Sequence, residues 1–249
     1  MIDWRIGSYQ LVWFKPSVER IHAHEFYEKV FGEMPDTSQA NRAPTPNAPF
    51  LSMAKSERGP ETYTAQVAPG RIDFFWQASN SADEAFPSMP QTLDHVSEVV
   101  KRVGASISGV MSGVTRVAFV ANLVSPTEGV DHVARQLAEF CELEPDSLDV
   151  SLQLNRRRPF GFDASEQMNR LLRAQMLQSQ LITLGVQAIE SGGMTPTFGT
   201  SFASHFMIDL NCFVTGKEYP TDAQTQMFNE FASEFSRIAR AASIREALR

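Results

Sequence analysis

The sequence predicts an α+β protein built from two similar β-α-β-β-β-α halves, with antiparallel sheets that are each covered by helices. Two observations lead to this fold class. Short segments of alternating apolar residues, typical of half-buried strands, occur between longer segments with apolar residues at helical spacing. The same order of segments then occurs a second time, which indicates an internal duplication. We expect the halves to span residues 1–110 and 111–249.

The first half begins with a strand over residues 8–14, in which every second residue is a large apolar one. A helix is expected over 18–32, with Ser17 as its candidate N-cap and Gly32 as its end. Residues 33–48 are rich in Pro, Asn, Ser and Thr and are typical of a loop. The half continues with strands over 49–56, 61–67 and 71–78 and a helix over 91–104.

The second half repeats this order, beginning with a strand over residues 115–124. Residues 125–128 are expected to open a helix, and a strand is expected over 148–155. An Arg-rich connection then leads to an extended segment over 173–190. The half ends with a turn-rich segment over 191–201, a strand over 202–213 and a long helix from Thr221 to the end of the chain.

The fourth strands of the two halves are similar in sequence. The first contains RIDFFWQ and the second contains MIDLNCF, which places Asp73 and Asp209 at equivalent positions. A repeated local sequence at the same step of a repeated element order favours two related halves. We therefore expect the two aspartates to lie on topologically equivalent strands.

Composition limits the functions that this chain can have. The formal net charge is −7, and acidic residues outnumber basic ones in both halves, which disfavours a general nucleic-acid binder. Cys141 and Cys212 have apolar neighbours, as expected for buried free thiols in a reducing compartment. Neither a signal peptide nor an apolar segment long enough to cross a membrane is indicated. We therefore expect a cytoplasmic protein without membrane association.

Three short patterns follow one another in the second half of the chain. They are an apolar strand ending in Asn-Arg-x-x-Pro (Asn155, Arg156, Pro159), an Asn-Arg-Leu segment (169–171) and an Ile-Asp-x-x-x-Phe strand (Ile208, Asp209, Phe213). Together with a Phe-containing last helix, they make residues 115–245 resemble a sporadically distributed bacterial family of similar length that has no established activity. The resemblance implies an accessory gene, such as one that serves defence against phage or a toxin-linked system.

Two Asn-Arg pairs and their neighbours are the candidate site residues. They are Asn155, Arg156, Arg157, Arg158, Asn169, Arg170 and Arg173. Arginine presents a planar fork of donors that matches carboxylate or phosphate, so these residues could form an anion-binding site. Alternatively, one or two of the arginines pair with Asp163, Glu166 or Asp209 and hold a long connection onto the sheet, while the others are solvated. We favour the structural interpretation.

No catalytic residue, metal site or cofactor is predicted. His205 and Asp209 lie on one expected strand, where four residues span about 13 Å, so they cannot contact each other within it. The glycines of residues 191–201 lack the spacing of a nucleotide-binding loop, and neither cysteine has a cationic environment that would activate it.

Three hypotheses about function remain. The favoured one is a non-enzymatic interaction protein, acting as a sensor or regulatory subunit of a bacterial accessory system. The second is an anion- or nucleic-acid-binding module that uses the cluster from Arg156 to Arg173. The third is a hydrolase or nuclease with an unrecognised site that involves Asp73, Asp209 or His205.

The expected partner is a second copy of the chain or another protein, and nucleic acid is not favoured. The last expected helix carries Phe228, Phe231 and Phe235 at helical spacing. This is more aromatic surface than a small sheet face is expected to cover, which indicates self-association or a hetero-complex.

Overall fold

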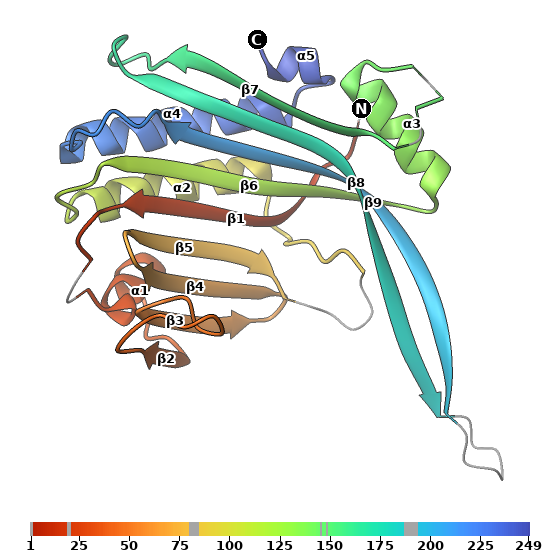
Figure 1. Ribbon diagram of the computed structural model, residues 1–249, viewed down its shortest axis with the longest axis horizontal. Coiled ribbons are helices and arrows are strands. Elements are labelled where there is room, and N and C mark those ends of the chain that lie inside the picture. Colours follow the sequence, from red (N-terminus) through yellow and green to blue (C-terminus); the bar gives the residue numbers. More distant parts are fainter. Residues whose placement is uncertain (1, 19–20, 80–84, 145, 148, 187–193) are drawn as a thin grey trace.

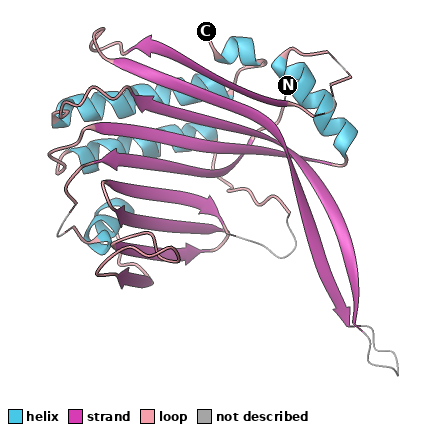
Figure 2. Ribbon diagram, in the orientation of Figure 1, coloured by secondary structure: helices cyan, strands magenta, loops and turns pink. Residues whose placement is uncertain are grey.

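A computed structural model describes residues 2–18, 21–79, 85–144, 146–147, 149–186 and 194–249 of the chain. These residues form five helices and nine strands (Figures 1 and 2). The helices are α1 (Ala23–Phe31), α2 (Leu93–Ser108), α3 (Val130–Cys141), α4 (Thr221–Ala239) and α5 (Ile244–Ala247). The strands are β1 (Arg5–Phe14), β2 (Thr37–Ala40), β3 (Ser52–Arg58), β4 (Glu61–Ala68), β5 (Arg71–Ala78), β6 (Arg116–Thr127), β7 (Ser151–Pro159), β8 (Gln167–Val186) and β9 (Met194–Cys212).

All nine strands belong to one antiparallel sheet with the order β2-β3-β4-β5-β1-β6-β9-β8-β7. The predicted α+β class is confirmed, and the strands of both halves belong to one shared sheet. β1 pairs with β6 from Arg5↔Val124 to Phe14↔Arg116, so the sheet runs across the expected boundary between residues 110 and 111. A strand at the edge of each half would expose unpaired backbone groups, and this pairing satisfies both edges at once.

The two halves contribute strands in the same order. Residues 1–110 supply β3-β4-β5-β1, with β2 added at the outer edge, and residues 111–249 supply β7-β8-β9-β6. Asp73 on β5 is paired with Val12 on β1, and Asp209 on β9 is paired with Val120 on β6. The two aspartates therefore lie on corresponding strands, each next to the strand through which its half joins the other half.

The helices cover one face of the sheet, and α2 and α4 lie side by side behind its centre (Figure 1). Trp13 of β1 packs against Phe228 of α4 at 4.6 Å between ring centres, and Phe119 of β6 packs against Phe235 at 5.2 Å. Gly104 of α2 permits this approach, because a Cβ atom there would lie 2.5 Å from the Cβ of Phe228. The core thus lies between the sheet and this helix pair.

The Phe-rich helix does not provide the association surface that the sequence suggested. Phe228, Phe231 and Phe235 are all fully buried within this one chain, between the sheet and α2. Burying each ring stabilises the fold by roughly 1.5–3 kcal/mol. The premise of the predicted self-association is therefore wrong, because the nine-stranded sheet is wide enough to cover the whole aromatic stripe.

Several predicted element boundaries differ from the structure. The first helix begins at Ala23 and not at residue 18, although it ends at Gly32 in a left-handed conformation as expected. The last helix ends at Ala239 and is followed by the short α5. Residues 125–127 continue β6 and do not open a helix, because Pro126 lies in the strand opposite Ala203.

The predicted loop over 33–48 contains β2, and the predicted Arg-rich connection is part of two strands. β7 extends through the arginines to Pro159, and β8 begins at Gln167, so the connection is only the short segment between them. The turn-rich segment predicted over 191–201 belongs to β9 from Met194 onward, and its first residues lie outside the described ones.

β8 and β9 extend beyond the sheet as a two-stranded hairpin (Figure 1). Their pairing runs from Met168↔Cys212 to Val186↔Met194, whereas β6 stops pairing with β9 at Thr127↔Phe202. β7 stops pairing with β8 at Ser151↔Gln175. In the described part of the chain, no helix has the length and apolar character needed to cross a membrane.

Candidate functional site

The alternation of β7 and β8 divides the predicted site residues between the two faces of the sheet. Arg156 is paired with Arg170, and Arg157 is paired with Asn169. Successive strand residues point to opposite faces, so one cluster in the sequence becomes two groups in space. The face that the helices cover, called the helix side, carries Arg156, Arg158 and Arg170. The opposite face, called the open side or open face, carries Asn155, Arg157, Asn169 and Arg173.

Arg170 lies at the centre of a buried ion network on the helix side. Its Nη1 donates to Glu234 Oε1 of α4 at 2.9 Å, and its Nη2 donates to the Leu248 carbonyl at 3.0 Å. Arg170 and Glu234 are each only 4% exposed. A buried charge of this kind must be paired and hydrogen-bonded to be tolerated, and here it is. The predicted structural role is therefore the one that the contacts of Arg170 support.

Glu234 forms ion pairs with arginines from three elements, β7, β8 and α4 itself. Besides Arg170, it accepts from Arg237 Nη2 at 2.7 Å and lies 3.4 Å from Arg158 Nη2. Burial disfavours its charged form, but the hydrogen bonds from Arg237 and Arg170 outweigh this and lower the pKa of Glu234. Arg237 also donates to the carbonyls of Glu246 and Ala247. The network thus joins β7, β8 and α4 to the end of α5.

The carboxylate partners differ from those that the sequence predicted. Asp163, Glu166 and Asp209 do not pair with these arginines; Glu230 and Glu234 of α4 do. Glu230 also accepts from the backbone N–H of Gly161 at 2.7 Å, which holds the turn between β7 and β8 against the helix. Glu166 instead pairs with Lys217 and accepts from the Tyr219 hydroxyl.

On the open side, side chains form a hydrogen-bonded row across three strands. Arg157 Nε donates to Asn169 Oδ1 at 3.0 Å, and Asn169 Nδ2 donates to Asn211 Oδ1 at 2.9 Å. Asn211 Nδ2 in turn donates to Asp209 Oδ1 at 2.8 Å. The guanidinium of Arg157 also lies 4.1 Å from the centre of the Phe213 ring. The row fixes the orientation of these polar groups within the chain itself.

A second row passes through His205. Its Nε2 lies 3.1 Å from Asn122 Oδ1, its Nδ1 lies 3.4 Å from Gln175 Nε2, and Asn122 Nδ2 donates to Ser8 Oγ at 3.0 Å. A neutral imidazole with its proton on Nε2 satisfies every donor and acceptor in this row. Burial, assisted by the charge of Arg173, lowers the pKa of His205 and favours that neutral form. His205 bonds to Asn122 and Gln175, so these contacts provide no His–Asp dyad.

Positive charge gathers on the open face of residues 111–249. Arg116, Arg157 and Arg173 lie on this part of the face, where Asp209 is the acidic strand residue. Burial raises the pKa of Asp209, against the hydrogen bond from Asn211 and the charge of Arg116. In a chain of net charge −7, this is a locally cationic surface.

The first half presents a more balanced arrangement at the corresponding place. Asp73 is fully buried, accepts from Gln10 Nε2 at 2.7 Å and pairs with Arg71 Nε at 2.9 Å. Burial raises the pKa of Asp73, and the charge of Arg71 opposes this rise. The open face therefore has one neutralised half and one cationic half.

Apolar side chains lie between these polar groups. Phe213 is 37% exposed, and Phe14, Phe75, Leu171 and Met207 are partly exposed on the same face. Among the described residues, no helix lies over this face (Figure 1). A half-apolar sheet face with ordered polar rows is a surface suited to a macromolecular partner.

The two thiols and the possible metal ligands were the remaining candidates for chemistry. Burial raises the pKa of the Cys141 and Cys212 thiols to about 11, so neither is a thiolate nucleophile near neutral pH. Within the described part of the chain, no three His, Cys, Asp or Glu side chains are grouped so that they could hold a metal ion.

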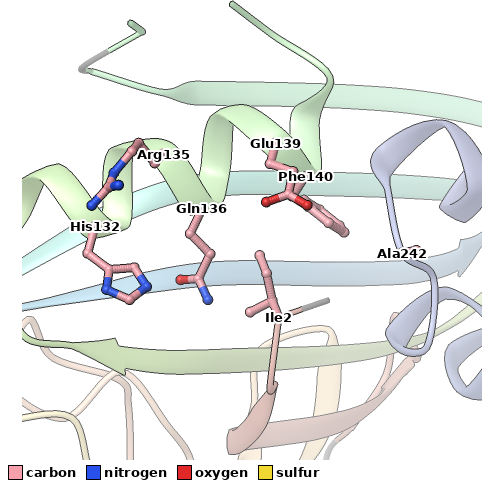
Figure 3. Close-up of a pocket in the computed structure, with 7 residues that line it drawn as sticks. All are labelled: Ile2, His132, Arg135, Gln136, Glu139, Phe140 and Ala242. Carbon is pink, nitrogen blue, oxygen red and sulfur yellow. The ribbon is translucent and has the colours of Figure 1, made fainter. Parts of the chain in front are cut away.

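A hollow of about 410 Å³ lies beside α3 (Figure 3). His132, Arg135, Gln136 and Glu139 line it from the helix, and Ile2 stands opposite them. Gln136 is already engaged, because it accepts from Ser204 Oγ at 2.7 Å. His132, Arg135 and Glu139 are exposed at the surface of α3 and converge on no common point.

Sequence reasoning missed the acidic partners on α4. Glu234 lies three residues after Phe231 and seven after Met227, and thus on the apolar stripe of the helix. A charged residue within such a stripe, with Arg237 one turn later, is the signal that could have indicated a buried ion pair. Strand alternation in the sequence places Arg116 and Asn211 opposite the apolar residues of their strands, but it does not indicate which strands will lie beside theirs.

No family model, curated protein or solved structure matches this chain.

Proposed function

We propose that the protein is a non-enzymatic interaction subunit, acting as a sensor or regulator, and that the open face of its sheet binds a protein partner. The observation that carries this proposal is the face itself. Its centre and C-terminal half present hydrogen-bonded polar rows, three arginines and partly exposed apolar side chains, without a covering helix among the described residues.

This face has the composition of a binding surface. Arginine and aromatic residues are enriched at the centres of protein interfaces. Arg157 and Phe213 form such a pair, and the row behind Arg157 holds its guanidinium in place. Because the side chains are already ordered, a partner would meet a surface that loses little conformational freedom on binding.

The biological setting is part of the proposal. The resemblance of residues 115–245 to a sporadically distributed bacterial family supports a role in a cytoplasmic accessory system, such as one for defence against phage or one linked to a toxin. The buried, inert thiols agree with a reducing compartment. The partner is a different protein or a second copy of this chain.

The test compares native purification of the wild-type protein with that of an Arg157→Glu/Arg173→Glu variant. If the partner is a different protein, reversing both charges should abolish its stoichiometric recovery. If the partner is a second copy of this chain, light scattering should show dissociation to monomers. The matched control is Arg135→Glu/Arg245→Glu, which reverses two exposed arginines on α3 and α5. A partner that survives the first variant and is lost with the control would contradict the proposal.

A second candidate function, binding of a polyanion such as single-stranded nucleic acid, is favoured by one observation. The guanidinium of Arg116 lies 4.8 Å from the centre of the Phe14 ring, and that of Arg157 lies 4.1 Å from the centre of the Phe213 ring. Arginines beside aromatic rings can hold phosphates and stacked bases. Fluorescence anisotropy with a labelled oligothymidylate at two salt concentrations tests it. Salt-sensitive binding that the double charge reversal abolishes would favour this candidate, and absence of binding at micromolar protein would remove it.

We also propose that the two halves arose by internal duplication. The shared strand order and the corresponding registers of Asp73 and Asp209 support this. In a crystal structure, superposing β1 on β6 should bring the two aspartates onto each other. A displacement of the second aspartate by one or more residues along its strand would contradict the duplication.

A further inference from the structure

A hollow of about 220 Å³ separates α1 from α2 on the helix side of the first half. Phe31 of α1, Tyr63 of β4 and Trp76 of β5 form its aromatic wall. Arg58, His95 and Arg102 contribute nitrogen donors around it. This place is remote from the open face and is independent of the function proposed above.

The aromatic wall is rigid. Phe31 lies 5.2 Å from both Tyr63 and Trp76 between ring centres, and Tyr9 stacks behind Trp76 at 4.9 Å with an interplanar angle of 11°. Rings packed from behind in this way keep their orientation when the hollow is empty. A planar ring can therefore enter against a surface that is already formed.

The acidic groups near the hollow are already occupied. Glu61 is buried, accepts from the Tyr63 hydroxyl and accepts from Gln91 Nε2 at 3.1 Å. Glu33 pairs with Arg58 at the rim. A cationic ligand would thus meet two carboxylates with established partners and three basic side chains.

The basic groups, in contrast, have unused donors. Arg58 Nε is buried and has no hydrogen-bond partner among the described residues. Arg102 has no carboxylate within ion-pair distance in the described part of the chain. The exposed side chain of Arg102 is among those that line the hollow. A buried donor without an acceptor is rare in folded proteins, and here Arg58, which carries one, lines an open space.

The corresponding gap in the second half is filled by the chain itself. α5 contacts both α3 and α4, and its Ile244 and Ala247 are buried. The carbonyls at the end of α5 accept from Arg170 and Arg237, which fix it in place. Among the described residues, no element plays this part between α1 and α2.

We propose that the hollow between α1 and α2 binds a small aromatic acid. The ring lies against Phe31, Tyr63 and Trp76, and the carboxylate accepts hydrogen bonds from Arg58 Nε and Arg102, with His95 at the entrance. A single ring with one carboxylate matches the size of the hollow and gives the unused donors an acceptor. Charge-assisted hydrogen bonds to arginine give this class its preference over neutral aromatic compounds.

The test uses benzoate as the probe and benzamide, which has the same shape without the charge, as its control. Calorimetric titration of the full chain should show benzoate binding, with benzamide at least tenfold weaker. Arg102→Ala should weaken benzoate binding about tenfold or more, whereas Arg240→Ala, which removes an exposed arginine of α4, should leave it unchanged. Quenching of tryptophan fluorescence should follow the same concentration dependence because Trp76 lies in the wall.

Three results would overturn this proposal. The first is the absence of benzoate binding at about 10 mM, a concentration at which even weak fragments bind detectably. The second is equal binding of benzamide, and the third is unchanged benzoate binding to Arg102→Ala. Thermal melts of each variant confirm that the fold is retained, and Arg102 is exposed enough for its removal to spare the core. Failure here would leave partner binding at the open face intact, so the two proposals fail separately.

Discussion

Neighbouring arginines on β7 and β8 occupy opposite faces of one sheet and have different surroundings. Arg170 faces the helices, where it is buried and bonded to Glu234 and to the end of α5. Arg157, opposite Asn169 in the same ladder, faces the open side and lies against Phe213. The difference between the two arises from strand alternation alone.

This contrast separates a structural role on the helix side from the binding role that we propose for the open side. On the helix side, removing one member of a buried pair leaves an uncompensated charge away from water. On the open side, solvent replaces most of what a removed arginine provides. We therefore expect removal of an arginine to reduce stability on the helix side more than on the open side.

The largest expected effect is that of Arg170→Ala. The change leaves Glu234 with one arginine fewer and the Leu248 carbonyl without its donor, so we expect a loss of about 3–5 kcal/mol in the free energy of unfolding. Urea denaturation measures it. An Arg170→Met/Glu234→Leu variant, which removes both charges, should recover part of the loss; a loss below about 1 kcal/mol for Arg170→Ala would remove the contrast between the faces.

A smaller effect is expected for Arg237→Ala. Two carbonyls near the end of α5 lose their donor, and Glu234 loses one of its three arginines but keeps Arg170 and Arg158. Each lost hydrogen bond costs about 0.5–1.5 kcal/mol. The effect should be local, with faster amide hydrogen exchange in α5 than in α4. Uniformly faster exchange throughout the sheet would show instead that this residue supports the whole fold.

The row through His205 should make stability depend on pH. Because burial lowers the pKa of His205 below its usual value near 6.5, the neutral form contributes stability above that pH. This contribution is lost as the pH falls below 6.5 and through the lowered value. Urea denaturation of the wild type and of His205→Gln can be compared at pH 7.5 and pH 5, roughly one unit or more on either side of the usual value. The decrease in the free energy of unfolding between the two pH values should be smaller in the variant.

The smallest effect on stability is expected for Arg173→Ala. This side chain is exposed, and among the described residues it has no ion-pair partner, so the free energy of unfolding should change by less than about 0.5 kcal/mol. Partner binding should fall although stability does not. A large loss of stability would mean that the open face is a structural surface.

Much of the fold could be predicted from local patterns. Strands β1, β5, β6 and β9 were identified by alternation, and the stripe of α4 by its phenylalanines, because one buried face imposes a period on each element. The division of the Asn-Arg pairs could not be predicted in the same way. It depends on the continuation of β7 through Arg158. The residues at this end of the strand are polar, so the sequence there lacks the apolar alternation that indicates a strand.

The partners of the arginines were also beyond local reasoning. Arg170 and Glu234 are 64 residues apart in the chain, and nothing near Arg170 indicates which helix will cover β8. The joining of the halves through β1 and β6 had the same cause, since pairing between distant strands is decided by the edges that each half leaves open.

The most direct test is urea denaturation of two double variants made on the same pair of strands. Arg158→Ala/Arg170→Ala removes arginines from the helix side, and Arg157→Ala/Arg173→Ala removes them from the open side. We expect the first to lose at least about 3 kcal/mol in the free energy of unfolding and the second to lose about 1 kcal/mol or less. Equal losses, or a larger loss for the open-side variant, would contradict the separation of a structural face from a binding face.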